Sequence, residues 1–130
     1  SIFKNWKFTP EDTIAAFGLH GALLCGPFVE ILKVEKSIWL EELSSFNITL
    51  SCNGKEVDKG HASNVLEVGP LEALRHILLD NKNLGRQVIL NPGDLVTTGT
   101  LTGAFSIKGD EVWSTKLHGI KLSGIEIKFN

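Results

Sequence analysis

The sequence predicts an α+β domain built on an antiparallel or mixed sheet, and three observations support this class. Residues 9–17 and 69–85 each open with residues that favour a helix N-terminus. Residues 46–52 alternate apolar with polar side chains and run into Asn53-Gly54, a strong hairpin signal. From residue 88 onward, short apolar stretches alternate with turn residues, as in successive strands. Two short helices beside many strands are typical of an α+β fold.

The composition suits one globular domain that spans residues 1–130. Of the 130 residues, 42% are hydrophobic and 22% are charged. The net charge of −2 and the scatter of the Lys and Arg residues argue against nucleic acid or a membrane as a partner. No apolar run approaches the ~20 residues of a membrane span, so we expect a cytoplasmic protein.

The cysteines and the missing methionine add two further expectations. Cys25 and Cys52 have no metal-binding or redox spacing, so we expect free thiols in a reducing cytoplasm. The chain begins at Ser1 and contains no methionine. A complete translation product normally starts with methionine, so we expect a piece of a longer protein or a processed chain.

Two helices are predicted from their termini. Thr9 is placed to cap a short helix that starts at Pro10 and ends near Phe17, because Gly18 follows. The second helix starts at Gly69-Pro70, and Gly85 is a plausible C-terminal cap. Its apolar face comprises Leu71, Leu74, Ile77 and Leu78.

The opposite face of the second helix carries Glu72, His76 and Asp80. Their i, i+4 spacing is compatible with a metal site, but no second element completes the ligand set. A solvated face with Glu–His pairing is the favoured interpretation.

The extended segments follow from alternation and turn residues. A buried strand is predicted at 22–25, closed by Gly26-Pro27, and a hairpin at 46–52 and 55–60. Further strands are predicted at 88–90, 95–98, 111–116 and 120–129, with turns at 91–94 and 108–110. Residues 36–43 fit neither pattern clearly.

The stretch GDLVTTGTLTG, residues 93–103, places a glycine between threonines at the end of a predicted strand. Gly99 would let a ligand approach the backbone, and the hydroxyls of Thr98 and Thr100 could bind a carboxylate or an enolate oxygen. The alternative is a strand bulge in which the threonines serve β propensity. Residue types alone favour this alternative.

A second candidate is His20, which lies between glycines just after the first helix. Histidine titrates near neutral pH and serves as an acid, a base or a hydrogen-bond donor. The commoner case is a histidine that is hydrogen-bonded locally in a turn. His61 and His118 are given no role.

The order of several short motifs along the chain resembles that of a known family. The successive motifs are Asn5-Trp6-Lys7, Asp12-Thr13-Ile14-Ala15, Gly18-Leu19-His20-Gly21, Asn53-Gly54, Gly60, Gly69-Pro70-Leu71-Glu72-Ala73-Leu74, Asn91-Pro92-Gly93-Asp94-Leu95-Val96-Thr97-Thr98-Gly99-Thr100 and Gly109-Asp110. Together they resemble the C-terminal part of the fumarylacetoacetate hydrolase superfamily, closest to the 2-keto-4-pentenoate hydratases and 4-oxalocrotonate decarboxylases. The Gly-Asp-x-Val-x-Thr-Gly-Thr element is the most specific part.

The resemblance implies a fold, an activity and site residues. The fold would be a mixed β-roll or sandwich, and the chain would be the C-terminal catalytic lobe of a homo-oligomeric enzyme. A divalent metal, Mg²⁺ or Mn²⁺, would chelate a small unsaturated 2-oxo acid and favour its enolate. His20 and Thr100 would be catalytic, and Thr98, Gly99, Thr100 and Gly21 would bind substrate.

This sequence departs from the family pattern at two places. Ala16, Phe17 and Leu19-His20 stand where the hydratases usually carry an acid, an amide and serines, so His20 is the one side chain in that run able to handle a proton. The family's metal-binding carboxylates lie before the Asn5-Trp6 region, so none of the 130 residues is expected to bind the metal.

Three readings of the function follow. The first is a hydratase-like lyase, with decarboxylation or C–C hydrolysis as variants within the superfamily; the 130 residues alone would be inactive. The second is a binding or assembly module that keeps the fold without the chemistry. The third is an unrelated β-roll with a fortuitous Thr-Gly-Thr.

Overall fold

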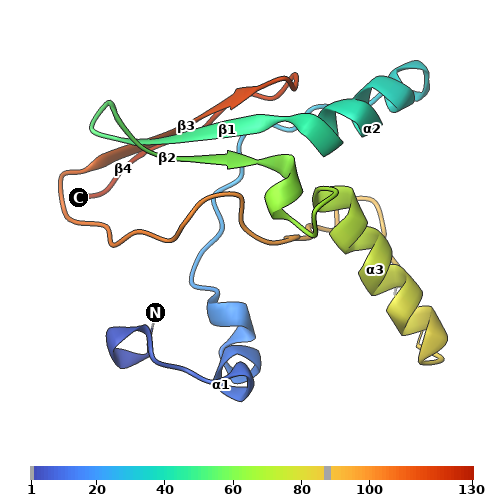
Figure 1. Cartoon of the computed structure of the whole chain (residues 1–130), viewed down its shortest axis with the longest axis horizontal. Coiled ribbons are helices and arrows are strands. Elements are labelled where there is room, and N and C mark those ends of the chain that lie inside the picture. The colour runs from blue at the N-terminus through green and yellow to red at the C-terminus, as the bar shows by residue number, and fades with distance from the viewer. Residues whose placement is uncertain (1, 87–88) are drawn as a thin grey trace.

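The computed structural model describes residues 2–86 and 89–130, and within those ranges it combines one sheet with three α-helices (Figure 1). The predicted α+β class is confirmed. The helices and strands, in chain order, are α1 (Pro10–Ala15), α2 (Lys36–Ser45), β1 (Asn47–Cys52), β2 (Lys55–His61), α3 (Pro70–Asn83), β3 (Val112–His118) and β4 (Glu126–Lys128).

The sheet has the strand order β2-β1-β3-β4, and each of its pairings is antiparallel. The predicted hairpin is confirmed, because β1 and β2 meet at a turn whose central residues both have positive φ, 51° at Asn53 and 74° at Gly54. Such φ values belong to the type I′ turn, whose twist matches that of the flanking strands. β1 also pairs with β3, so the hairpin is extended by a strand from much later in the chain.

The helix termini follow local chemistry. The Thr9 hydroxyl accepts the Asp12 N–H (3.2 Å), and the Asp12 carboxylate accepts the Thr9 N–H (2.9 Å), which is a complete capping box. α1 ends at Ala15 rather than near Phe17, because Phe17, Gly18 and Leu19 all have positive φ. A 3₁₀ helix, η2 (Phe17–Leu19), occupies that position.

The other two helices fit the sequence pattern to different degrees. α3 begins at Pro70 as predicted, and Gly85 donates its N–H to the Lys82 carbonyl (3.1 Å) just beyond the helix. α2 forms over the residues whose pattern was ambiguous. Its Trp39 is buried, and this packing supplies the preference that the local pattern lacked.

Several predicted strands are wrong. Residues 22–25, 89–90 and 95–98 form no strand, Val88 lies outside the described residues, and only Glu126–Lys128 of the predicted strand 120–129 is one. The physical reason is pairing: a strand needs a neighbour for its backbone groups, and residues 22–25, 89–90 and 95–98 take no place in the strand order of the sheet. Leu23 and Leu24 are half exposed, so the apolar run 22–25 is not buried either.

The core lies at one end of the sheet. Trp39, Phe46, Ala62 and Val65 are buried where α2, the start of β1 and the 3₁₀ helix η4 (Ala62–Asn64) meet. The Ala62 N–H donates to the Phe46 carbonyl (2.9 Å), which ties the two ends of the hairpin together. Many other large apolar side chains remain exposed, among them Phe17, Phe28, Val34 and Leu84.

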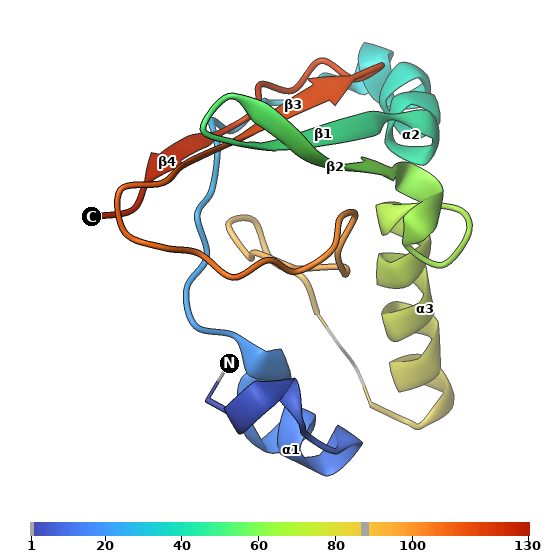
Figure 2. The same cartoon turned by 60° about the vertical axis from the view of Figure 1, so that its left-hand side comes forward.

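α1 lies apart from the sheet, and the segment that leads into β3 (orange) runs between them in both views (Figure 2). Near the N-terminus, the rings of Phe3 and Trp6 lie 5.8 Å and 6.1 Å from the ring of Phe8. Both cysteines are free, as predicted. No helix in the described part of the chain is long and apolar enough to cross a membrane.

Candidate functional site

A pocket of about 650 Å³ lies between two segments that are far apart in the sequence, and it contains most of the predicted site residues. Its lining comprises Phe17, Gly18, Leu19, His20, Gly21, Ala22, Leu23, Leu95, Thr97, Gly99 and Thr100. Four of the predicted residues, His20, Gly21, Gly99 and Thr100, therefore share one pocket.

Thr98 is the predicted site residue that the pocket leaves out, and Thr97 takes its place in the lining. Leu95, Thr97, Gly99 and Thr100 line the pocket, whereas Thr98 is half-buried and lies outside the lining. Because Thr97 and Thr98 are neighbours of the same residue type, the sequence does not tell which of them lines the pocket.

Thr100 already uses its hydroxyl proton. Its Oγ1 donates to the Thr102 carbonyl (3.0 Å). A hydroxyl has one proton to donate and two lone pairs that accept. In this geometry Thr100 offers a ligand an acceptor, and to act as a donor it must first leave the Thr102 carbonyl.

Gly99 has φ +123°, a conformation that side-chain-bearing residues rarely adopt. A Cβ atom there would lie 3.7 Å from Val65 Cγ1, which is ordinary van der Waals contact. The glycine is therefore required by the backbone conformation and not by crowding from neighbouring residues.

The His20 side chain is exposed, and no hydrogen bond to its ring is formed within residues 2–86 and 89–130. Its backbone N–H donates to the Phe17 carbonyl (3.3 Å), which holds the turn after η2. His20 also borders a second cavity of about 410 Å³, whose lining is mostly apolar. His20 thus borders two cavities, and its ring has no internal hydrogen bond among the described residues that a ligand would have to replace.

The pocket does not fit a divalent metal on its own. Its lining offers one imidazole and two hydroxyls but no carboxylate. Mg²⁺ and similar hard cations bind mainly through carboxylate and other oxygen ligands. Across the described ranges, no group of three or more His, Cys, Asp or Glu side chains could hold a metal ion.

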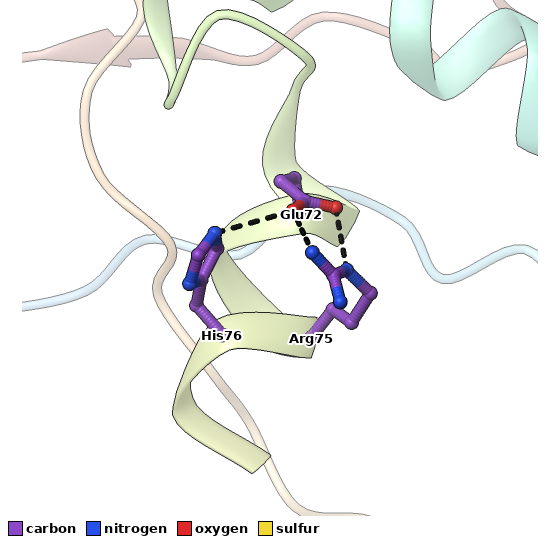
Figure 3. Close-up of polar contacts among 3 residues, drawn as sticks. All are labelled: Glu72, Arg75 and His76. Atoms are coloured by element: carbon purple, nitrogen blue, oxygen red, sulfur yellow. Dashed lines mark hydrogen bonds and ion pairs between the residues drawn. The ribbon is translucent and has the colours of Figure 1, made fainter. Parts of the chain in front are cut away.

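The polar face of α3 carries an ion-pair cluster (Figure 3). Glu72 accepts the Arg75 Nε–H (2.8 Å) and a second contact from Arg75 Nη2, and His76 Nε2 lies 3.2 Å from the same carboxylate. The hydrogen bonds from Arg75 lower the pKa of Glu72. His76 and Asp80 are exposed and His76 pairs with Glu72, as predicted, but the Glu72 side chain itself is only 20% exposed.

The other two histidines make local contacts. His61 Nδ1 accepts the Ser63 N–H (3.1 Å) and lies 2.8 Å from the Ser63 hydroxyl. His118 Nε2 lies 3.4 Å from Thr49 Oγ1. Neither side chain lines the pocket that contains His20.

No protein-family model matches the chain, and no curated protein matches it in sequence. The solved structures that match it in fold include 4-oxalocrotonate decarboxylase from Pseudomonas putida G7 complexed with calcium and acetate, and the same enzyme complexed with magnesium and adipate. Each match has a TM-score of 0.57 and 19% identity, and covers 68% of this chain.

The chain spans about a third of the length of these decarboxylase structures, because the match covers 32% of each. At this level of identity the likeness concerns the fold. The chain therefore has the fold of a part of 4-oxalocrotonate decarboxylase, as the resemblance to the fumarylacetoacetate hydrolase superfamily predicted.

Proposed function

We propose that the chain is the C-terminal catalytic lobe of a hydratase-like lyase that acts on a small unsaturated 2-oxo acid of the 2-keto-4-pentenoate type. The observation that carries the proposal is the shared pocket of His20 and Thr100. The fold likeness to a decarboxylase of a 2-oxo acid supports the same substrate class.

Each part of such a substrate has a counterpart in the pocket. The carboxylate and the 2-oxo oxygen need hydrogen-bond donors, which the Thr97 and Thr100 hydroxyls would supply. The carbon chain would lie against Leu23, Leu95 and Phe17. His20 would take a proton from the attacking water or return one to carbon as general base or acid.

A divalent metal, Mg²⁺ or Mn²⁺, belongs to the proposal for the whole enzyme, because both decarboxylase structures hold a divalent metal. The pocket lining lacks the carboxylates to bind it. Its ligands would therefore come from residues other than those of this pocket, and the 130 residues alone would not turn substrate over.

The test uses the full-length enzyme and 2-keto-4-pentenoate. His20→Asn removes the proton-transfer group and is expected to lower kcat by about 10²–10⁴-fold. His118→Asn serves as the matched control, because His118 is an exposed histidine outside the pocket, and it should keep wild-type kcat. Equal activity of the two variants would remove His20 from the mechanism, and a wild-type enzyme inert toward every 2-oxo acid would refute the function.

Decarboxylation is the second candidate, because both matched structures are of a decarboxylase. The two reactions differ in their products: one adds water across a double bond, and the other releases CO₂ from the acid. Measuring CO₂ release beside substrate consumption, with 4-oxalocrotonate and 2-keto-4-pentenoate as alternative substrates, distinguishes them. A C–C hydrolase would instead yield two carbon fragments from one substrate.

A binding or assembly module without chemistry is the third candidate, and the lack of carboxylates in the pocket favours it. This reading predicts that the full-length protein binds a 2-oxo acid, such as 2-oxopentanoate, without consuming any substrate in the presence of Mg²⁺ or Mn²⁺. Turnover under those conditions would exclude it.

A further inference from the structure

We infer that Asp58, Gly60 and Asn64 are positioning residues that fix residues 99–103 and thereby hold Gly99 and Thr100 in the pocket. None of the three lines the pocket itself. They act through contacts with the backbone just after Thr100. The inference rests on the proposed function for the meaning of the pocket, but the anchoring can be tested without it.

Asp58 on β2 makes the first anchor. Its Oδ2 accepts the Gly103 N–H at 2.7 Å, while its Oδ1 accepts the Lys59 N–H at 2.8 Å. With both oxygens engaged, the carboxylate has a fixed orientation. A charge-assisted bond of this kind is stronger than one between neutral groups.

Gly60 provides the space for the second contact. A Cβ atom at Gly60 would collide with the carbonyl oxygen of Leu101. Asp58 and Gly60 are two residues apart on β2, so they lie on the same face of the strand. That face is the one on which residues 101–103 cross the sheet.

Asn64 makes the third contact. Its side-chain Nδ2 donates to the same Leu101 carbonyl at 2.8 Å. The Leu101 carbonyl is thus held from the side by an amide and lies against Gly60, where a side chain would displace it. The anchors at Leu101 and Gly103 follow Thr100 by one and three residues.

These side-chain contacts do what the backbone hydrogen bonds of a sheet would do for a strand: they fix the position of the segment. Residues 95–103 belong to no strand, so no sheet pairing fixes their backbone. Side-chain bonds from β2 and η4 are what place this segment beside residues 17–23. Loss of an anchor should therefore disturb the pocket before it disturbs the sheet.

The experiment measures amide hydrogen exchange and amide chemical shifts by NMR in the full-length protein. Asp58→Ala and Asn64→Ala are each expected to speed exchange at Gly103 or its neighbours by about tenfold, as loss of one hydrogen bond to a charged or buried group implies. The amide shifts of Gly99 and Thr100 should move, while those of β1 and β3 stay. Asp58→Asn keeps one acceptor oxygen and should restore part of the protection.

Glu56→Ala is the matched control, because Glu56 is a carboxylate on the same strand that pairs with Lys59 and forms no hydrogen bond or ion pair with residues 99–103. It should leave exchange at Gly103 unchanged. Wild-type exchange at Gly103 in Asp58→Ala would overturn the anchoring. Faster exchange with unmoved Gly99 and Thr100 shifts would overturn the positioning role.

A titration of the full-length protein with 2-oxopentanoate, in the presence of Mg²⁺, links the anchors to ligand binding. The anchor variants should bind it about tenfold more weakly than the wild type, with Glu56→Ala unchanged. Wild-type affinity in both anchor variants would contradict the inference. A wild-type full-length protein that binds no 2-oxo acid would count against the proposed function, and the exchange and shift data would still decide the anchoring.

Discussion

Two demands compete for the Thr100 hydroxyl. In the structure its proton goes to the Thr102 carbonyl, whereas the proposed substrate needs it for a carboxylate or oxo oxygen. The internal bond and the substrate bond would exclude each other, because one hydroxyl donates once. Binding would then release the Thr102 carbonyl to another donor or to water.

Substitution of Thr100 tests this exchange. Thr100→Val keeps the shape and removes the hydroxyl, so 2-oxopentanoate affinity should fall about 3- to 10-fold, the value of one hydrogen bond. Thr100→Ser keeps the hydroxyl and is expected to stay close to wild type. Calorimetric titration of both variants measures the difference, and equal affinities would show that the hydroxyl does not contact the ligand.

Gly99 gives a second residue-level prediction, on stability. Gly99→Ala should lower the free energy of unfolding by about 1–3 kcal/mol, because the backbone there has positive φ although space for a methyl group exists. Gly109→Ala is the control, since Gly109 has neither positive φ nor a close neighbour. Urea unfolding measures both. A neutral Gly99→Ala would mean that the backbone at this position relaxes freely.

At the level of elements, Glu111 organises the start of β3. Its Oε2 accepts the Lys108 N–H (2.9 Å) and the Trp113 indole N–H (3.0 Å). The Lys108 bond contributes most, and both bonds lower the pKa of Glu111. Its carbonyl also accepts the Phe129 N–H (2.9 Å), which links the residue to the chain beyond β4.

A lowered pKa in the folded state stabilises the fold above the pKa of the unfolded chain, and this stabilisation is lost as the pH falls toward the folded value. Thermal midpoints of the wild type should therefore fall as the pH drops below about 4.5. The thermal midpoint of Glu111→Gln should fall less over this pH range. The pH dependence that remains would be due in part to Glu72, whose pKa is also lowered. Parallel profiles for wild type and variant would contradict the assignment.

The elements also show what could be predicted from the sequence. The N-cap at Thr9 and the turn at Asn53-Gly54 are set by residues a few positions apart, so both were predicted correctly. The segments 22–25 and 95–98 carry strand-like residues, but whether a strand forms depends on a partner elsewhere in the chain. Single-sequence reasoning has no access to that partner.

The same limit applied to the site. His20 and Thr100 were predicted as separate candidates, and the resemblance joined them. The anchors at Asp58 and Asn64 were not anticipated, because their partners at Gly103 and Leu101 lie 45 and 37 residues away. No local pattern marks a contact of that range.

At the scale of the whole molecule, exposed apolar surface outweighs the core. Four hydrophobic residues are buried among the described ones, whereas side chains such as Phe28 (80%) and Val34 (85%) are largely exposed. Large uncovered apolar patches mark interaction surfaces or association. We propose that the homo-oligomer expected from the family resemblance covers part of this surface.

The 130-residue chain is accordingly expected to self-associate. Sedimentation velocity over a range of concentrations should show the mass rising above 14.2 kDa. Because apolar burial is not screened by salt, the association should persist at high ionic strength. Phe28→Ser should weaken it, with Lys55→Ser as an exposed polar control. A monomer at all concentrations would contradict the prediction.

The positions of the tryptophans give the molecule its own set of optical reporters. The sequence has three tryptophans and no tyrosine, so indole rings dominate its near-ultraviolet absorption. Trp39 is buried in the core, and Trp6 is exposed near the N-terminus. Trp113, on β3, donates its indole N–H to the Glu111 carboxylate. Each ring thus samples a different polarity and a different part of the fold. Variants that keep one indole at a time would separate the emission of the core, the sheet and the N-terminal segment.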